Sequence, residues 1–258
     1  MVVTEIARKR MIEAQGEWRP EDFSKRLEVI ENRIIVYSDM HIPYHDVDLF
    51  IRLLETAKRE KIEAIVLLGD TWDMKQFGSY GDDTPSHLFS TAKSIGKEVI
   101  DLLLESHLHV YISPGNHDMR WIKKNNYQCS FHDMCNLMGI GDDLIDPREG
   151  IAVVTVSESP AWDAVGNTLL VHPEKYGSNP LVEPSKLALK FDKNVISGHA
   201  HHWGLTKMVV GEKLYHVCES GGGFDARFFK YVQYTVSSMK GMVSGYCTLI
   251  DGHISLYD

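Results

Sequence analysis

The chain has 258 residues, of which 43% are hydrophobic, so it can bury the core of one large domain or of a domain with insertions. Its formal net charge of −9 argues against broad, non-specific binding to a nucleic-acid duplex, because such binding needs many basic contacts with phosphates. Short or single-stranded nucleic acid stays open as a partner, because metal ions can neutralise phosphate locally.

The first 31 residues are polar and charged, and we expect them to form a helical arm. They contain no apolar run of the length of a signal peptide. No stretch of the chain approaches the roughly 20 apolar residues that a membrane span needs. We therefore expect a cytoplasmic protein without a membrane partner, and the sequence does not indicate an oligomeric state.

Strand-like and helical patterns alternate through the first half of the chain. Apolar runs predict strands at 34–37, 64–68 and 109–112, and amphipathic patterns predict helices at about 47–61 and 86–106. This order predicts parallel strands with helices on both faces of the sheet. In such sheets, ligands bind beyond the carboxyl ends of the strands.

The second half of the chain is more mixed, and residues 121–141 predict a helical cap or insertion. Further strand and helix patterns follow at 151–156, 168–171, 184–191 and 194–197. The C-terminal part looks antiparallel, with a hairpin at 209–214 and an Asp251-Gly252 turn. We therefore expect an α/β sandwich of two mixed sheets with helices on the outer faces, formed by residues 32–258.

Cysteines are sparse, and they do not indicate a disulfide framework. Within the segment 121–141, Cys129, His132 and Cys135 have the residue types of a zinc site but lack a clear fourth ligand. We expect ordinary helix or loop chemistry there.

Five polar clusters each follow an apolar, strand-like run. They are Asp39-Met-His41, Gly69-Asp70-Thr-Trp-Asp73, Gly115-Asn116-His117-Asp118, Val171-His172 and Gly198-His199-Ala-His201. Together they offer oxygen and imidazole ligands in numbers that suit two metal ions. Two of the clusters contain a pair of candidate ligands two residues apart, a spacing that points both side chains the same way at the end of a strand.

In this order, the clusters resemble the motifs of the calcineurin-like metallophosphoesterase superfamily: D-x-H, GDxx(D/N), GNH(D/E), a His that usually follows Gly, and GHxH. The resemblance covers Ser38 to His201 and implies the two-sheet α/β/β/α sandwich of that superfamily. It implies a first metal ion bound by Asp39, His41, Asp70 and His201. It implies a second ion bound by Asp70, Asn116, His172 and His199. Asp70 would bridge the two ions, and Val171 departs from the pattern because it stands where the superfamily usually has glycine.

The resemblance also implies catalytic roles for His117 and Asp73. His117 would face the substrate and protonate the leaving oxygen or stabilise its charge, and Asp73 would orient His117 and keep it protonated. A hydroxide that bridges two ions roughly 3.5–4 Å apart would attack the phosphorus in line. The mixed oxygen and nitrogen ligands suit transition metals, and we expect Mn²⁺, with Fe, Zn²⁺ or Ni²⁺ as alternatives.

The expected substrate is a phosphate ester. Met74 stands where Ser/Thr protein phosphatases carry an arginine that grips phosphate, which argues against that branch. The sequence favours a phosphodiesterase or nuclease acting on a nucleotide or short nucleic acid. The alternatives are a phosphomonoesterase acting on a metabolite or phosphoprotein, and a non-catalytic binding module. We expect substrate contacts from Arg120, Trp203 and Arg227.

Overall fold

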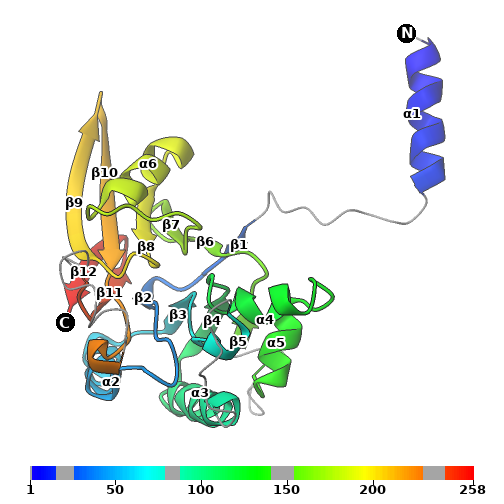
Figure 1. Ribbon diagram of the computed structural model, residues 1–258. Helices are drawn as coiled ribbons and strands as arrows, with labels where there is room; N and C mark the ends of the chain where they lie inside the picture. Colours follow the sequence, from blue (N-terminus) through cyan, green and yellow to red (C-terminus); the bar gives the residue numbers. More distant parts are fainter. Residues whose placement is uncertain (1, 16–25, 79–87, 141–153, 229–241) are drawn as a thin grey trace.

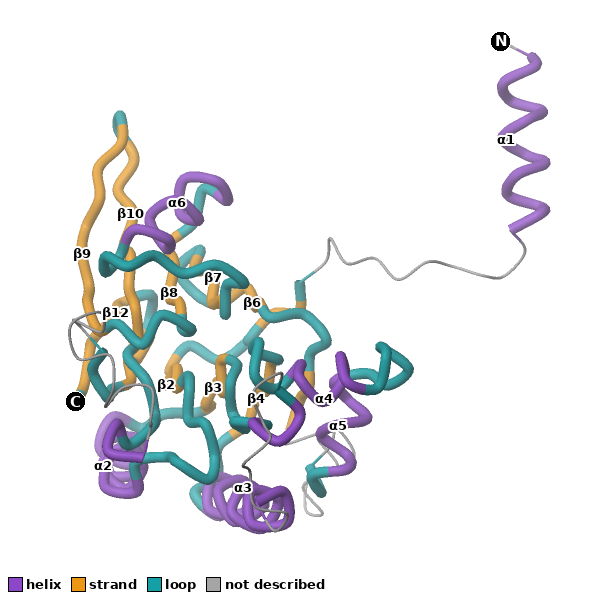
Figure 2. The backbone as a smooth tube through the Cα atoms, viewed as in Figure 1, coloured by secondary structure: helices purple, strands orange, loops and turns teal. Residues whose placement is uncertain are grey.

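Two six-stranded sheets lie face to face, with helices on the outer face of each (Figures 1 and 2). The computed structural model describes residues 2–15, 26–78, 88–140, 154–228 and 242–258. The two mixed sheets with outer helices confirm the predicted fold class.

Sheet I contains the predicted parallel strands. Its strands are β2 (Arg33–Tyr37), β3 (Ala64–Leu68), β4 (His109–Ser113), β5 (Val154–Val156), β11 (Tyr246–Ile250) and β12 (His253–Tyr257). Their order is β12-β11-β2-β3-β4-β5, and β2 to β5 are parallel. The β11–β12 hairpin is antiparallel and turns at Asp251 and Gly252, both with positive φ. The predicted parallel core and C-terminal hairpin are therefore confirmed.

Helices cover the outer face of sheet I. They are α2 (Val47–Glu60), α3 (Leu88–Glu105), α4 (Met119–Lys124) and α5 (Phe131–Leu137). Asp46 caps α2 by accepting a hydrogen bond from the Leu49 amide at 2.9 Å. Alternate residues of each parallel strand, such as Ile65 of β3, point to this helical side, while their neighbours, such as Val66, point to the other sheet.

The segment expected to be a cap is helical, but it packs on the main core. Phe131, Met134 and Cys135 of α5 are buried in the cluster that lies between sheet I and its helices. The segment therefore closes one end of the helical layer. Within the described residues, neither Cys129 nor Cys135 forms a disulfide, and neither belongs to a potential metal-binding group.

Sheet II is built from the second half of the chain and one N-terminal strand. Its strands are β1 (Leu27–Glu28), β6 (Ala161–Ala164), β7 (Thr168–Val171), β8 (Asn194–Ser197), β9 (Trp203–Val210) and β10 (Lys213–Ser220). Their order is β1-β6-β7-β8-β10-β9, and α6 (Val182–Phe191) packs on the outer face. The β9–β10 hairpin is antiparallel as predicted, but β10 also pairs parallel with β8. The C-terminal part is therefore antiparallel in its two hairpins, as expected, and parallel only where β10 meets β8.

The predicted helical arm includes a helix, α1 (Val2–Gln15), of which residues 5–13 are exposed. The last residues of the arm belong to sheet II instead. The Val29 amide donates to the carbonyl of Asp163 at 2.9 Å, and the Arg26 guanidinium pairs with the carboxylate of Asp163 at 3.1 Å. Within the described residues, no helix combines the length and apolar character that a bilayer crossing requires.

The core between the sheets holds the two layers together. Trp162 of β6, Leu170 of β7 and Ile196 of β8 are fully buried there against Val36 and Val66 of sheet I. Burial of such side chains is the main favourable term in folding. This core fixes the distance between the loops that follow the two sets of strands.

Leu170→Ala should lower the free energy of unfolding by about 2–5 kcal/mol, because it leaves a cavity between the two sheets. The control is Leu189→Ala on α6, where the side chain is 49% exposed. That variant should lose about 0.5 kcal/mol or less. Urea unfolding at equilibrium measures both, and equal losses would contradict a closely packed core between the sheets.

Candidate metal centre

The loops after β2, β3, β4, β7 and β8 meet at one place. Backbone hydrogen bonds join them: the Asp39 amide donates to Gly69 at 3.0 Å, and the Gly198 amide donates to Val171 at 3.2 Å. The seven predicted metal ligands all lie in these loops, so residues spread from 39 to 201 form one cluster.

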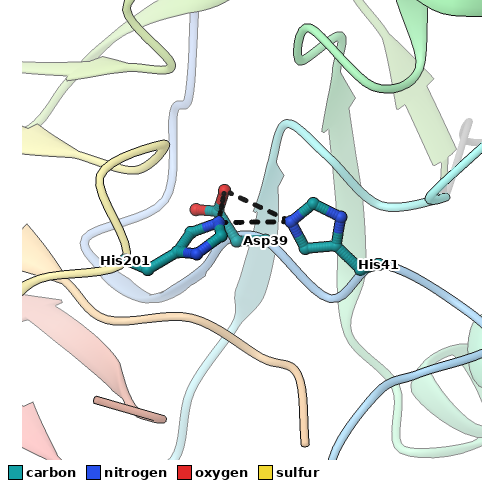
Figure 3. A group of neighbouring side chains, drawn as sticks. All are labelled: Asp39, His41 and His201. Carbon is teal, nitrogen blue, oxygen red and sulfur yellow. Dashed lines mark hydrogen bonds and ion pairs between the residues drawn. The ribbon is translucent and has the colours of Figure 1, made fainter. Parts of the chain in front are cut away.

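The first group of polar side chains is Asp39, His41 and His201 (Figure 3). His201 Nε2 lies 3.1 Å from Asp39 Oδ1 and 3.2 Å from His41 Nε2. His41 Nε2 lies 3.9 Å from the same Asp39 oxygen. All three residues are buried, and their ligand atoms face one another across a space of the size that a cation fills.

The second group is Asp70, His172 and His199. His172 Nε2 lies 3.5 Å from Asp70 Oδ2 and 3.3 Å from Asn116 Oδ1, so the amide predicted as a ligand lies in this group too. Asp70 Oδ2 is also 3.9 Å from His41 Nε2 of the first group. One oxygen of Asp70 therefore lies between the two groups, as the predicted bridge requires.

Hydrogen bonds hold one oxygen of each carboxylate and leave the other for a cation. Asp39 Oδ2 accepts from the His199 amide at 2.8 Å and from the hydroxyl of Ser38, whereas the buried Oδ1 makes no well-aligned hydrogen bond among the described residues and has His201 Nε2 beside it at 3.1 Å. Asp70 Oδ1 accepts from the His117 amide at 2.7 Å. A buried carboxylate oxygen without a donor is costly unless a positive charge lies beside it. The residues therefore fit a metal ion.

His172, which follows the departure from the motif at Val171, is held in the orientation of a ligand. It is buried, and its Nδ1 lies 2.9 Å from the carbonyl oxygen of Leu68. A carbonyl oxygen can only accept, so Nδ1 carries the proton and donates. In the neutral ring the Nε2 lone pair then points to the second group, which is how ligating histidines are usually oriented.

The loops adopt unusual backbone conformations at the candidate ligands. Residues with left-handed φ are Asp39 (55°), His41 (49°), Asp70 (51°), His199 (73°) and His201 (57°). Each such residue costs on the order of 1–3 kcal/mol and persists only where the surroundings enforce it. Strands β2 and β8 have already ended, so left-handed turns, and not strand alternation, bring the paired ligands together. The predicted convergence was right, but its predicted cause was wrong.

Two glycines allow the loops to approach so closely. A Cβ at Gly115 would lie 2.2 Å from Asp70 Oδ1, and a Cβ at Gly198 would lie 1.9 Å from the Ser38 hydroxyl. Any side chain at these positions would displace a carboxylate or the residue that orients it. The glycines of the sequence clusters are therefore part of the site.

The charges of the site oppose one another strongly. Burial works to raise the pKa of Asp70, but His172, His117 and His41 outweigh it and hold that pKa well below its usual range. Burial and the neighbouring His172 lower the pKa of His199 to about 4, so His199 is neutral at pH 7. The site thus presents ionised carboxylates and at least one neutral imidazole.

His117 forms a third group with His41 and Asp70 that could hold a metal ion, and it also contacts a carboxylate and a guanidinium. Its Nδ1 lies 2.8 Å from Asp73 Oδ1, and its Nε2 lies 2.9 Å from Arg120 Nη2. Burial opposes ionisation, but Asp70 and Asp73 raise the pKa of His117 above its ordinary value. Asp118 instead accepts from the amides of Trp72 and Gly115, each at 2.9 Å. It therefore joins the loops after β3 and β4 and does not orient His117.

The three predicted substrate residues do not lie together. Arg120 is beside His117, and its Nη1 donates to the carbonyl of Asp73 at 2.9 Å. Trp203 donates its indole N–H to the carbonyl of Tyr257 in β12 at 3.3 Å, so it joins the two sheets. Arg227 pairs with Asp225, two residues before it, at 2.9 Å.

Phe224 is a residue of the site that the sequence prediction missed. Its buried ring lies 4.6 Å from the ring of His201 and 5.8 Å from that of His41, measured between centroids. The three glycines before it in the sequence were a signal that the backbone closely approaches other residues there. The Gly223 amide donates to the carbonyl of Ser38 at 2.8 Å, and a Cβ there would lie 2.6 Å from the ring of Tyr37.

Comparison with known proteins agrees with this geometry. The family model described as calcineurin-like phosphoesterase matches residues 32–216, which is well over half of the chain. A comparison with curated protein sequences found no match.

Solved structures of low sequence identity are also similar. Vps29 of Entamoeba histolytica, complexed with zinc, is 14% identical, with 87% of this chain and 97% of that one covered and a TM-score of 0.41. TT1561 of Thermus thermophilus is 14% identical, with 88% and 98% covered and a TM-score of 0.41. YfcE, a phosphoesterase from E. coli, is 15% identical, with 87% and 98% covered and a TM-score of 0.39.

The two-sheet fold, the clustered ligands and the matching family model define a metal-dependent hydrolase of phosphoric esters. The chain belongs to the calcineurin-like phosphoesterase family. Members of this family bind two metal ions, and the described side chains include three overlapping groups that could hold such ions.

Metal binding should depend on pH through His172. Burial opposes ionisation of this side chain, but Asp70 and Asp39 outweigh it and raise its pKa to about 9. At pH 7 the ring carries a proton that a metal ion must displace, because only the neutral imidazole is a ligand. Below pH 9 the affinity for one ion should therefore fall by about tenfold per pH unit.

Calorimetric titration of the metal-free protein with Mn²⁺ between pH 6.5 and 9.5 measures this dependence. Buffers of different ionisation enthalpy report the protons released per ion. An affinity that is constant from pH 7 to 9 would show that His172 is neutral before the metal binds.

Proposed function

We propose that this protein is a phosphodiesterase or nuclease that acts on a nucleotide or short nucleic acid with two divalent transition-metal ions. Mn²⁺ is the proposed metal, and Fe, Zn²⁺ and Ni²⁺ are the alternatives that the same ligand types accept. The observation that carries the proposal is the position of Asp70 Oδ2 between two groups of buried ligands, 3.9 Å from His41 and 3.5 Å from His172.

The proposed ligands divide into two sets, and the contacts within the first and second groups support this division. Asp39, His41, Asp70 and His201 would hold one ion, and Asp70, Asn116, His172 and His199 would hold the other. Two ions held in this way supply a nucleophile by lowering the pKa of water and neutralise the charge that develops on a phosphoryl group. The protein's remaining tasks are to orient the substrate and to protonate the leaving oxygen.

His117 is the proposed proton donor. Asp73 holds its Nδ1, so Nε2 is the nitrogen that faces a leaving oxygen. Arg120 lies at that nitrogen, and because a guanidinium can only donate, the contact at 2.9 Å requires an unprotonated Nε2. A bound substrate would displace Arg120 from His117 and offer it phosphate oxygens, which match the bidentate geometry of arginine.

The preference for a diester rests on the residue after Asp73. Met74 is 3% exposed and packs in the core between sheet I and its helices, so this position offers no cation to a phosphate. Arg120 would then be the nearest cation to the leaving oxygen. A single guanidinium suits the one negative charge of a diester better than the two of a monoester.

The first test is hydrolysis of bis-p-nitrophenyl phosphate and p-nitrophenyl phosphate by protein reloaded with Mn²⁺. We expect release of p-nitrophenol from the diester and little from the monoester. Asp70→Asn is the control and should lose almost all activity, because the two ions then share no carboxylate. Activity on the monoester alone would support a phosphomonoesterase. No activity with Mn²⁺, Fe²⁺, Zn²⁺ or Ni²⁺, in protein shown to hold two ions, would support a binding module.

His117→Ala should slow turnover of a diester with a poor leaving group by about 10²–10⁴-fold, because such a group needs protonation as its bond breaks. Turnover of the nitrophenyl diester should change less, because nitrophenolate leaves without a proton. Methyl p-nitrophenyl phosphate is the diester with a good leaving group, and a dinucleotide is the diester with a poor one. Metal content should stay at two ions per chain, and loss of an ion would mean that His117 is a ligand.

A further inference from the structure

We infer that Asp73 positions the metal ligand His41 as well as the proton donor His117, so that one carboxylate sets the affinity of one metal site. The inference rests on the proposed function, because it takes His41 to be a ligand. It adds a role in metal binding to a residue that was expected only to orient the acid.

The geometry of Asp73 is shared between two histidines. Its Oδ1 lies 2.8 Å from Nδ1 of His117 and 3.2 Å from Nδ1 of His41. The two imidazoles meet edge to face, with centroids 4.4 Å apart. Asp73 is 4% exposed and His41 is fully buried, so the protein shields both contacts from water.

The contact with His41 fixes which nitrogen can bind a metal. A carboxylate oxygen accepts, so the proton of a neutral His41 lies on Nδ1. The lone pair of Nε2 then points to the first group, where His201 Nε2 is 3.2 Å away. A carboxylate behind a ligating histidine also raises the basicity of the ring and thereby strengthens the bond to the metal.

Asp73 is itself held by backbone contacts. Its amide donates to the carbonyl of Ile42 at 3.1 Å, and its own carbonyl accepts from Arg120 Nη1 at 2.9 Å. The loop after β3 is thereby fixed to the loop after β2, which carries His41. These contacts hold the Asp73 backbone beside the loop of His41.

The two proposed metal sites differ in the group that contacts Nδ1 of the ligating histidine. His172 donates its Nδ1 proton to the backbone carbonyl of Leu68 at 2.9 Å, which is a neutral acceptor that no substitution removes. The Nδ1 of His41 instead contacts an anionic side chain, Asp73, at 3.2 Å. Removal of the Asp73 carboxylate should therefore weaken the site that contains His41 and spare the site that contains His172.

Calorimetric titration of metal-free wild-type protein and three variants with Mn²⁺ tests this inference. Asp73→Ala should lower the affinity for one of the two ions by about 10- to 100-fold and leave the other unchanged. Asp73→Asn keeps an acceptor oxygen without the charge and should lose less. His117→Ala is the matched control, because it removes the other partner of Asp73 Oδ1, and both affinities should stay at the wild-type values.

Absorption spectroscopy gives a second measurement of metal binding, and like calorimetry it does not depend on activity. Titration with Co²⁺ gives absorption bands that report the ligands of each ion, and Asp73→Ala should shift the bands of only one. Far-ultraviolet circular dichroism and thermal melts of the metal-free variants check folding. If Asp73→Ala does not fold, Asp73→Asn decides the question by the same comparison.

Wild-type affinities for both ions in the folded Asp73 variants would overturn the inference. So would an equal loss in His117→Ala, because the effect would then not pass through His41. Failure of the proposed function appears differently, as wild-type protein that holds two ions but does not hydrolyse diesters. The affinity comparison remains valid in that case.

Discussion

The buried carboxylate of Asp70 is the constraint on which the rest of the site depends. One of its oxygens accepts from the His117 amide, and the other faces histidines of two different ligand groups. A carboxylate in such a position needs positive charge around it, because water cannot reach it. That need explains the close approach of the loops, the lack of a Cβ at Gly115 and the packing of three imidazoles around a single carboxylate.

The sheets supply the rigidity that this arrangement requires. Five candidate ligands adopt left-handed backbone conformations, which an isolated loop would leave. Each of these loops begins at the end of a buried strand, and hydrogen bonds between loops, such as that from the Asp39 amide to Gly69, hold them together. The core between the sheets therefore does more than stabilise the fold. It keeps loops from both sheets at the separation that two metal ions need.

The sequence predicted the elements that have strong local patterns. Continuous apolar runs marked β2, β3 and β4, and the Asp251-Gly252 pair marked the last hairpin. The strands β1 and β6 were missed, because neither Leu27–Glu28 nor Ala161–Ala164 contains a continuous apolar run, and β1 pairs with a partner far along the chain. The parallel pairing of β10 with β8 was also missed. Phe224 was not named as a site residue, because the three glycines before it indicate a close approach of the backbone but not which histidines the ring will contact.

By itself, the sequence determined the types of ligand, their order and their positions at strand ends, because these are written in short motifs. Only the tertiary structure decided which atoms meet. It gave Asp70 its position between two groups, placed Trp203 against β12 and showed that Asp73 Oδ1 contacts both His41 and His117. The physical reason is that a motif fixes chemistry along the chain, whereas shared contacts depend on how two sheets and five loops pack together.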